Sequence, residues 1–172
     1  EGLLAEVFSN IGIGTLVYAN EYRQIRPAKK SDLGSILALT KNAIESAELM
    51  DRSLTDIEAN VAEYFLFEID GNPVGCFSLT VFTEANVAEL GSVCVSAAHE
   101  NQGIGRKLVE YAEKLGRDHG LDRLFVLSTQ TFKWFQSKAG FCEGTLDDLP
   151  AARRVSAAES GRKSKVLLKS LE

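Results

Sequence analysis

Two glycines separated by one residue stand where the sequence predicts that a strand ends and a helix begins. The stretch is HENQGIGRKL, residues 99–108, in which Gly103 and Gly105 precede the basic pair Arg106 and Lys107. The start of a helix leaves backbone N–H groups without intrahelical partners, and glycines allow a phosphate to approach them closely. A Gly-x-Gly pair alone therefore predicts either a phosphate-binding turn or a plain strand-to-helix corner.

The elements on both sides of this turn can position such a site. Residues 87–96, VAELGSVCVS, alternate as a strand, and Gly91 in its middle indicates a bulge or a splayed strand. Residues 104–115 present one apolar face and predict a helix that ends at Gly120. Residues 123–129, RLFVLST, are nearly all apolar, as expected for a strand covered on both faces.

The remaining patterns predict strands and helices throughout the chain. Strands are expected over 22–28, in the two arms of a hairpin over 64–82 that turns at Asp70–Gly71–Asn72, and over 164–171. Helices are expected after Ser31–Asp32, after Ser53 or Thr55, and over 130–141 with Gly140 closing it. Residues 2–8 and 14–19 have helical and β patterns. Together these elements predict a mixed α/β sheet.

The composition limits the classes of function. A chain of 172 residues fits one globular domain, and its net charge of −5 argues weakly against a nucleic-acid partner. Cys76, Cys94 and Cys142 lack CxxC spacing, and with only two histidines they predict reduced, buried thiols rather than a disulfide frame or metal site. No apolar run reaches the roughly 18–20 residues of a membrane span. We therefore expect a cytoplasmic protein without metal or membrane ligands.

The strand, the turn and the helix together resemble the acetyl-CoA site of GNAT-type acetyltransferases. In that family a Gln or Arg, two spacers and Gly-x-Gly or Gly-x-Ala precede the helix; here Glu100 stands in the first position, and WFQSKAGF resembles the late helix followed by Gly-Phe. The resemblance implies an α+β fold with a mixed, mostly antiparallel sheet, flanked by helices and splayed between its fourth and fifth strands. It also implies two sets of acetyl-CoA contacts. Backbone N–H groups of Gln102, Gly103, Ile104, Gly105, Arg106 and Lys107 hold the pyrophosphate, and Val93, Cys94 and Val95 pair with the pantetheine arm.

A narrower resemblance covers nearly all of the chain. The stretches IRPAKKSDL, DRS, AELGSVCVS, LFVLSTQTFKWF, DLPAARR and GRKSKV are similar, in order, to the acetyltransferase domain of bacterial-type N-acetylglutamate synthases. The resemblance implies acetyl transfer from acetyl-CoA to the α-amino group of L-glutamate, in arginine biosynthesis. It further implies that residues 21–172 form the acetyltransferase domain. Residues 1–20 are expected to be a linker or the tail of a preceding amino-acid-kinase-like domain, and the full-length protein is expected to be a homo-oligomer.

Two residues are candidates for proton transfer. Acetyl transfer requires a neutral amine, so a base must accept a proton near neutral pH. Glu89 matches the family's glutamate and is expected to be this base, directly or through a water; the alternative is a surface carboxylate on a strand. Ser128 matches the family's acid and is expected to assist the departing CoA thiolate; the alternative is a cap for helix 130–141. The family transfers directly in a ternary complex, so Cys94 is favoured as a buried hydrophobe over an acylated nucleophile.

Glutamate carries two carboxylates, which fork-shaped guanidinium groups bind well. The residues expected to bind the acceptor are Arg52, Ser92, Arg153 and Arg162; for each basic residue alone, a solvated surface charge is the alternative. Asp51 stands where the family usually has a second arginine, and Gln130 where it commonly has arginine.

Two other functions stay open from the sequence. One is a GNAT-type enzyme that acetylates a different amine or a protein N-terminus, which would not need the arginines. The other is a domain that senses CoA or amino acids without catalysis, which would bind acetyl-CoA and release no CoA.

Overall fold

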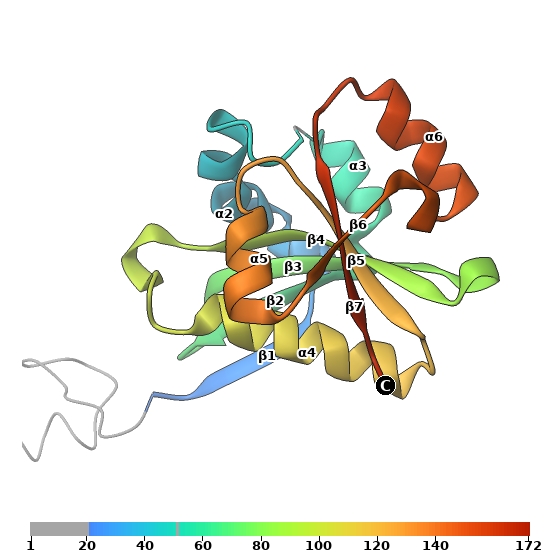
Figure 1. Cartoon of the computed structure of the whole chain (residues 1–172). Coiled ribbons are helices and arrows are strands. Elements are labelled where there is room, and N and C mark those ends of the chain that lie inside the picture. Colours follow the sequence, from blue (N-terminus) through green and yellow to red (C-terminus); the bar gives the residue numbers. More distant parts are fainter. Residues whose placement is uncertain (1–20, 51) are drawn as a thin grey trace, which may run out of the picture.

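The centre of the molecule is a seven-stranded sheet with the strand order β1-β2-β3-β4-β5-β7-β6 (Figure 1). The structure is a computed structural model that describes residues 21–50 and 52–172. The strands are β1 (Arg23–Pro27), β2 (Tyr64–Ile69), β3 (Asn72–Phe82), β4 (Val87–Val95), β5 (Arg123–Ser128), β6 (Cys142–Gly144) and β7 (Lys165–Ser170). Only β4 and β5 run parallel among these neighbours, and the other pairs are antiparallel. The predicted mixed, mostly antiparallel sheet is confirmed.

Helices cover both faces of this sheet. They are α2 (Leu33–Glu45), α3 (Leu54–Ala59), α4 (Ile104–Asp118), α5 (Phe132–Ala139) and α6 (Ala151–Glu159). The largest core packs α4 and α5 onto the sheet, through residues such as Leu108 and Phe135. A second core packs α2 and α3 through Ile36 and Ile57, and a third includes Ala157 of α6. The amphipathic patterns seen in the sequence thus place the helices in separate layers (Figure 1).

The local signals for the hairpin and for α3 are confirmed. Asp70 and Gly71 both have positive φ, 50° and 79°, as required by a two-residue turn that joins β2 to β3. Ser53 accepts a hydrogen bond from the Asp56 N–H at 3.1 Å, and the Asp56 carboxylate accepts one from the Ser53 N–H at 3.1 Å. This reciprocal capping starts α3 where the sequence predicted.

Asp32 has a different role from the cap predicted for α2. Its side chain makes no capping bond to that helix. The Asp32 carboxylate instead accepts bonds from Arg26 Nη1 at 2.7 Å, Arg26 Nη2 at 3.0 Å and the Lys29 N–H at 2.7 Å. Asp32 therefore fastens the start of α2 to the edge strand β1.

A bulge in β4 opens the sheet. Ser92 is buried and has a φ of 51°, a left-handed conformation that is unusual for serine. The register pairs on the two sides of the shift are Cys76 with Cys94 and Ser78 with Gly91. Two residues of β4 thus face one of β3, which defines a bulge. Beyond it β4 leaves β5, because the two strands pair only over Val87–Glu89. The predicted splay between the fourth and fifth strands is confirmed.

The sequence did not predict β6 or α6. The α6 stretch AARRVSAAE is rich in strong helix formers, but its one large apolar residue, Val155, is 57% exposed, so a periodic apolar face is missing. Cys142, which was expected to be buried, lies exposed on β6, whereas Cys76 and Cys94 are buried; all three are free thiols. The segments predicted over 2–8 and 14–19, the assignment of residues 1–20 and the position of Asp51 lie outside the described residues.

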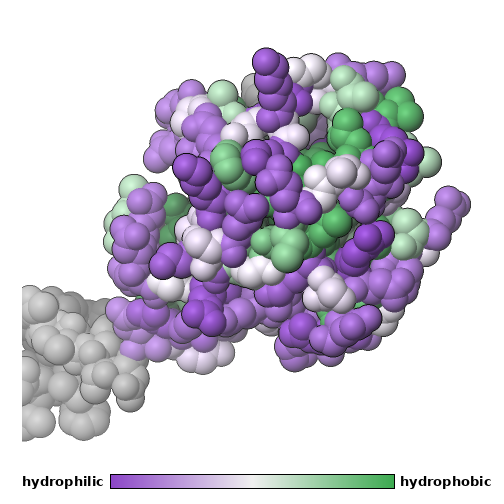
Figure 2. All heavy atoms as spheres, viewed as in Figure 1, coloured by the Kyte–Doolittle hydropathy of each residue, from purple (hydrophilic) through white to green (hydrophobic). Residues whose placement is uncertain are grey.

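The surface is mainly hydrophilic on the face drawn in Figure 2, with apolar side chains gathered where α6 lies. Within residues 21–50 and 52–172, none of the helices has the length and apolar character needed to cross a membrane.

Candidate functional site

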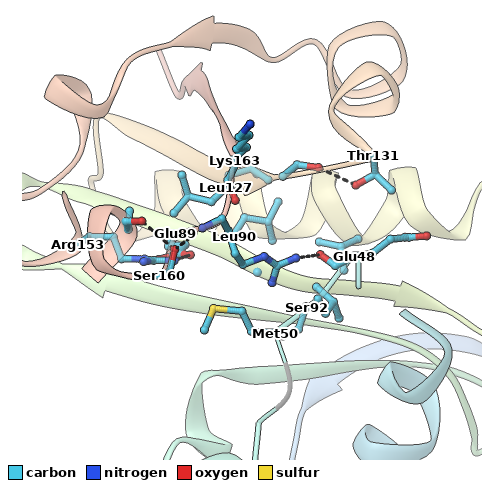
Figure 3. Close-up of a pocket in the computed structure, with 18 of the residues that line it drawn as sticks. Glu48, Met50, Glu89, Leu90, Ser92, Leu127, Thr131, Arg153, Ser160 and Lys163 are labelled. Carbon is cyan, nitrogen blue, oxygen red and sulfur yellow. Dashed lines mark hydrogen bonds and ion pairs between the residues drawn. The ribbon is translucent and has the colours of Figure 1, made fainter. Parts of the chain in front are cut away.

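A cavity of about 480 Å³ lies where β4 and β5 diverge. Its walls come from the loop after α2, from β4 and β5, from α6, and from the segment between α6 and β7. The residues predicted from the sequence that line it are Arg52, Glu89, Ser92, Val93, Ser128, Arg153 and Arg162. The fold therefore brings the proton-transfer and acceptor-binding candidates into one space, although they are far apart in the sequence (Figure 3).

Glu89 of β4 forms a two-pronged ion pair with Arg153 of α6. Arg153 Nε donates to Glu89 Oε2 at 2.5 Å, and Arg153 Nη2 donates to Glu89 Oε1 at 3.0 Å. The two side chains are 21% (Arg153) and 13% (Glu89) exposed, and Figure 3 shows them joined by dashed lines. Glu89 is thus a largely buried carboxylate on the cavity wall and not a solvated surface charge.

Ser128 lies at the end of β5 and is 5% exposed. Its Oγ is 3.0 Å from the Oγ1 of Thr131. Thr131 occupies the N-cap position of α5, so Ser128 is not the cap of that helix, the alternative considered from the sequence. Ser128 therefore presents a hydroxyl, already in a hydrogen bond, to the same cavity as Glu89.

The loop after α2 is held over the cavity by two side chains from distant parts of the chain. Arg162 Nη2 donates to the Ala47 carbonyl at 2.6 Å and to the Glu48 carbonyl at 3.2 Å. Gln130 Nε2 donates to the Ser46 carbonyl at 2.8 Å. Gln130, at the position where the resembling family commonly has arginine, thus binds the loop after α2 in this chain. Among the described residues, the side-chain hydrogen bonds of Arg162 all come from Nη2, so Nε and Nη1 remain as single donors.

The cavity is rich in positive charge for a chain whose net charge is −5. Arg52 lines it and donates from Nη1 to the hydroxyl of the buried Tyr64 at 3.2 Å, which leaves most of its donors for a ligand. The charged residues of the lining are the cations Arg52, Arg153, Arg162 and Lys163 and the carboxylates Glu48 and Glu89. This excess of cations favours an anionic ligand.

The glycine turn has the geometry of an anion cradle. Gly103 has a φ of 76° and precedes α4, and the Lys107 N–H donates to the Gly103 carbonyl at 3.1 Å. The N–H groups of Ile104, Gly105 and Arg106 belong to the first turn, which has no intrahelical acceptors for them, and they donate to no acceptor among the described residues. A Cβ on Gly105 would stand 3.3 Å from the Trp134 ring, so a side chain there would crowd the turn.

A second cavity, of about 640 Å³, adjoins the first along β4 and reaches Glu100, which precedes the turn. Residues 93–97 and Glu100 line it on one side and α2 on the other, and Val93 also lines the first cavity. The residues predicted to pair with the pantetheine arm, Val93, Cys94 and Val95, thus lie between the cradle and the catalytic candidates. Glu100 stands three residues before Gly103 and lines this cavity, so its negative charge opposes a phosphate there.

The buried cysteines belong to the core. Cys94 packs in the cluster beneath α2, and Cys76 Sγ donates to the carbonyl of the bulge residue Ser92 at 3.5 Å. Hydrogen bonding to Cys94 and burial raise the pKa of the Cys76 thiol well above its ordinary value. Neither thiol belongs to the lining of the first cavity, although Cys94 lines the second.

Sequence reasoning missed several residues of the first cavity. Glu48 and Met50 come from the loop after α2, Thr131 from the start of α5, and Lys163 from the segment before β7. Lys163 stood in a basic cluster, whereas no motif marked Glu48 or Met50. Within the described part of the chain, no group of three or more His, Cys, Asp or Glu side chains is arranged to hold a metal ion.

Comparison with known proteins decides which family this fold and cavity represent. The sequence profile described as the acetyltransferase (GNAT) family matches residues 31–141, a span that contains α2, β4, the cradle and α5. The chain belongs to the acetyltransferase (GNAT) family. The GNAT fold predicted from the strand, the turn and the late Gly-Phe is therefore confirmed.

Individual relatives carry more specific names. The chain is 36% identical, over 98% of its length, to an amino-acid acetyltransferase of Neisseria meningitidis serogroup A, and covers 38% of that protein. It is similar to N-acetylglutamate synthase from Neisseria gonorrhoeae complexed with coenzyme A and N-acetyl-glutamate, with a TM-score of 0.84 and 35% identity, over 99% of this chain and 40% of that one. The same enzyme complexed with coenzyme A and L-arginine gives a TM-score of 0.79 and 34% identity, over 99% of this chain and 38% of that one. This GNAT chain spans about two fifths of the length of these relatives.

Proposed function

We propose that this GNAT chain transfers the acetyl group of acetyl-CoA to the α-amino group of L-glutamate, as a step of arginine biosynthesis. The observation that carries the proposal is the first cavity, in which a buried carboxylate, a buried hydroxyl and an excess of guanidinium groups meet beside the unpaired edge of β4. The names of the relatives, which include an N-acetylglutamate synthase, support glutamate as the acceptor.

The residues present fit acetyl-CoA along one continuous path. The free N–H groups at the start of α4 suit the pyrophosphate, since a helix N-terminus favours anions. The backbone of Val93–Val95 has no partner on β5 and is available to the amide groups of the pantetheine arm. The thioester then lies in the first cavity, between Glu89 and Ser128.

The reaction requires two proton transfers. One removes a proton from the acceptor's ammonium group before attack, and the other delivers a proton to the CoA sulfur as it leaves. Glu89 accepts a proton from the ammonium group of the acceptor, and the neutral amine attacks the thioester carbonyl. The N–C bond forms in this attack and gives a tetrahedral intermediate, and the C–S bond breaks as the intermediate collapses. Ser128 hydrogen-bonds the departing sulfur and passes a proton to it, which the amine nitrogen's second proton replaces on Ser128, so CoA leaves as the thiol and the product is the amide.

Arg52 and Arg162 are proposed to bind the two carboxylates of glutamate. Among residues 21–50 and 52–172, each side chain is hydrogen-bonded through a single guanidinium nitrogen, to Tyr64 for Arg52 and to the loop after α2 for Arg162. Arg52 therefore retains the Nε and Nη2 fork for a carboxylate, which is the geometry that guanidinium groups bind best, whereas Arg162 offers Nε and Nη1 as single donors.

Substrate analogues and variants test this assignment together. L-Glutamine and 4-aminobutyrate each lack one of the two carboxylates, and we expect kcat/KM for both to fall at least about tenfold below that for L-glutamate, because a charged hydrogen bond contributes roughly 1.5–3 kcal/mol. Arg52→Ala and Arg162→Ala should each raise KM for glutamate and discriminate less against one analogue. Faster turnover with an amine that has no carboxylate than with glutamate would refute the acceptor assignment. Tight acetyl-CoA binding without CoA release for any amine would favour a sensing domain.

A further inference from the structure

Arg153 differs from the other arginines of the cavity in how completely its donors are used. Its Nε and Nη2 bind the two oxygens of Glu89, and its Nη1 donates to Ser156 Oγ at 3.0 Å on the same helix. All three guanidinium nitrogens of Arg153 therefore have protein partners. Among the described residues, Arg52 in contrast donates hydrogen bonds from Nη1 alone, and Arg162 donates them from Nη2 alone.

The pair with Glu89 also has the geometry that fixes a carboxylate. Two parallel N–H···O bonds to a planar guanidinium define both the position and the plane of the carboxylate, which one lysine ammonium cannot do. Each oxygen of Glu89 receives one bond from Arg153, and an ionised carboxylate has about four lone-pair sites. Glu89 thus keeps free lone pairs, held in a fixed direction, for a proton from an amine.

The anchoring of Arg153 reinforces this arrangement. Ser156 Oγ accepts from Arg153 Nη1 and donates to the Arg153 carbonyl at 3.1 Å, so one turn of α6 fixes the guanidinium. The side chains of Arg153 and Glu89 are 21% and 13% exposed, so water competes little for their bonds. A fork filled in this way is not open to the carboxylates of an acceptor.

We infer that Arg153 is a positioning residue, which orients the carboxylate of Glu89 for proton abstraction, and is not a ligand of the acceptor's carboxylates. The inference rests on the proposed function, since it gives Arg153 a place in that same reaction. It also removes Arg153 from the acceptor-binding set expected from the sequence, which leaves Arg52, Ser92 and Arg162. In this role α6 places the Arg153 side chain beside Glu89.

A split between kcat and KM distinguishes positioning from substrate binding. Misplacing a reacting group by about 1 Å can cost about 100-fold in rate, so Arg153→Ala should lower kcat about 10- to 100-fold. KM for glutamate should stay within about twofold, because no bond to the acceptor is lost. Arg153→Lys keeps the charge but not the fork and should be almost as impaired, and guanidinium ion should partly restore the kcat of Arg153→Ala. A KM that rises tenfold with kcat unchanged would overturn the inference.

Arg154 supplies a matched control on the same helix. It is exposed and donates to the carbonyls of Asp147 and Leu149, outside the cavity lining. Arg154→Ala should leave kcat, KM and the response to guanidinium ion unchanged. An equal loss of kcat in both variants would show a general effect of disturbing α6 and would also overturn the inference.

A thermal-unfolding cycle tests the pair without any turnover, and so separates this inference from the proposed function. Contributions of interacting residues are not additive, whereas those of independent residues are. The combined variant Glu89→Gln with Arg153→Ala should melt no lower than the less stable single variant, because the second change removes a charge that the first left unpaired. Additive losses in Tm would show that Arg153 does not hold Glu89 in solution, even if the chain acetylates a different amine or none.

Discussion

The start of α4 offers a sharp test of the cradle, because one residue there has a conformation that other residues rarely adopt. Gly103 has a φ of 76°, and a Cβ added to it would have no atom within 4 Å. Gly103→Ala therefore introduces no clash. Its whole effect comes from placing a residue with a Cβ in the left-handed region.

The size of this effect follows from known backbone preferences. A left-handed conformation costs a non-glycine residue roughly 1–2 kcal/mol, and the stiffer unfolded chain returns roughly 0.4–1 kcal/mol. The net loss of stability is about 1 kcal/mol, which lowers Tm by about 2–4 °C for a protein of this size. Without ligand, the turn in Gly103→Ala can leave the left-handed conformation, and acetyl-CoA must restore that conformation when it binds. The affinity of the variant for acetyl-CoA should therefore fall about 3- to 10-fold.

Gly71 provides a matched control for this prediction. It has a φ of 79°, equally open surroundings and a place in the β2–β3 turn, outside the lining of both cavities. Isothermal titration calorimetry with acetyl-CoA should give weaker binding for Gly103→Ala and unchanged binding for Gly71→Ala, with similar shifts in Tm. Unchanged affinity in both variants, or an equal loss in both, would refute the assignment of the turn as the pyrophosphate site.

Three further predictions concern single carboxylates. Glu89→Gln should lower kcat about 100- to 10,000-fold, the usual contribution of a general base, while acetyl-CoA affinity by calorimetry stays the same; activity within threefold of the unaltered chain would exclude the role of base. Glu100→Gln should leave acetyl-CoA binding unchanged or slightly tighter, since it removes a negative charge near the cradle, and a marked loss would show that Glu100 is itself a ligand. The Arg26 hydrogen bonds hold the pKa of Asp32 below its ordinary value of 3.8. The stability from this pair is thus present above pH 4 and is lost as pH falls through the lowered pKa. Asp32→Asn should therefore lower Tm at pH 7 and narrow the difference between Tm at pH 7 and at pH 3; an unchanged difference would contradict the linkage.

The parts of the site that could be predicted depend on local sequence. The cradle, the hairpin turn and the cap of α3 are each specified within a few residues, by positive-φ glycines or by a Ser–Asp capping pair. Gly91 indicated a break in β4 because a glycine inside a strand often marks a bulge. The αL residue itself is Ser92, and no rule about serine predicts that conformation.

The parts that could not be predicted depend on contacts between distant segments. Arg153 and Glu89 are 64 residues apart, and Arg162 binds carbonyls 114 and 115 residues away. Only the folded sheet and the position of α6 determine these partners. The sequence therefore indicated that arginines belong to the site, but not which of them would bind the base and which would keep donors for a ligand.

The central claim is that this chain acetylates L-glutamate, and release of CoA is its most direct measure. The purified chain should be incubated with acetyl-CoA and L-glutamate, with CoA quantified by chromatography because the exposed Cys142 would react with thiol reagents. We expect CoA and N-acetylglutamate to form in equal amounts, and at least about 100-fold more slowly with Glu89→Gln. CoA release that does not depend on glutamate, or N-acetylglutamate formation within threefold of the unaltered rate in Glu89→Gln, would contradict the account.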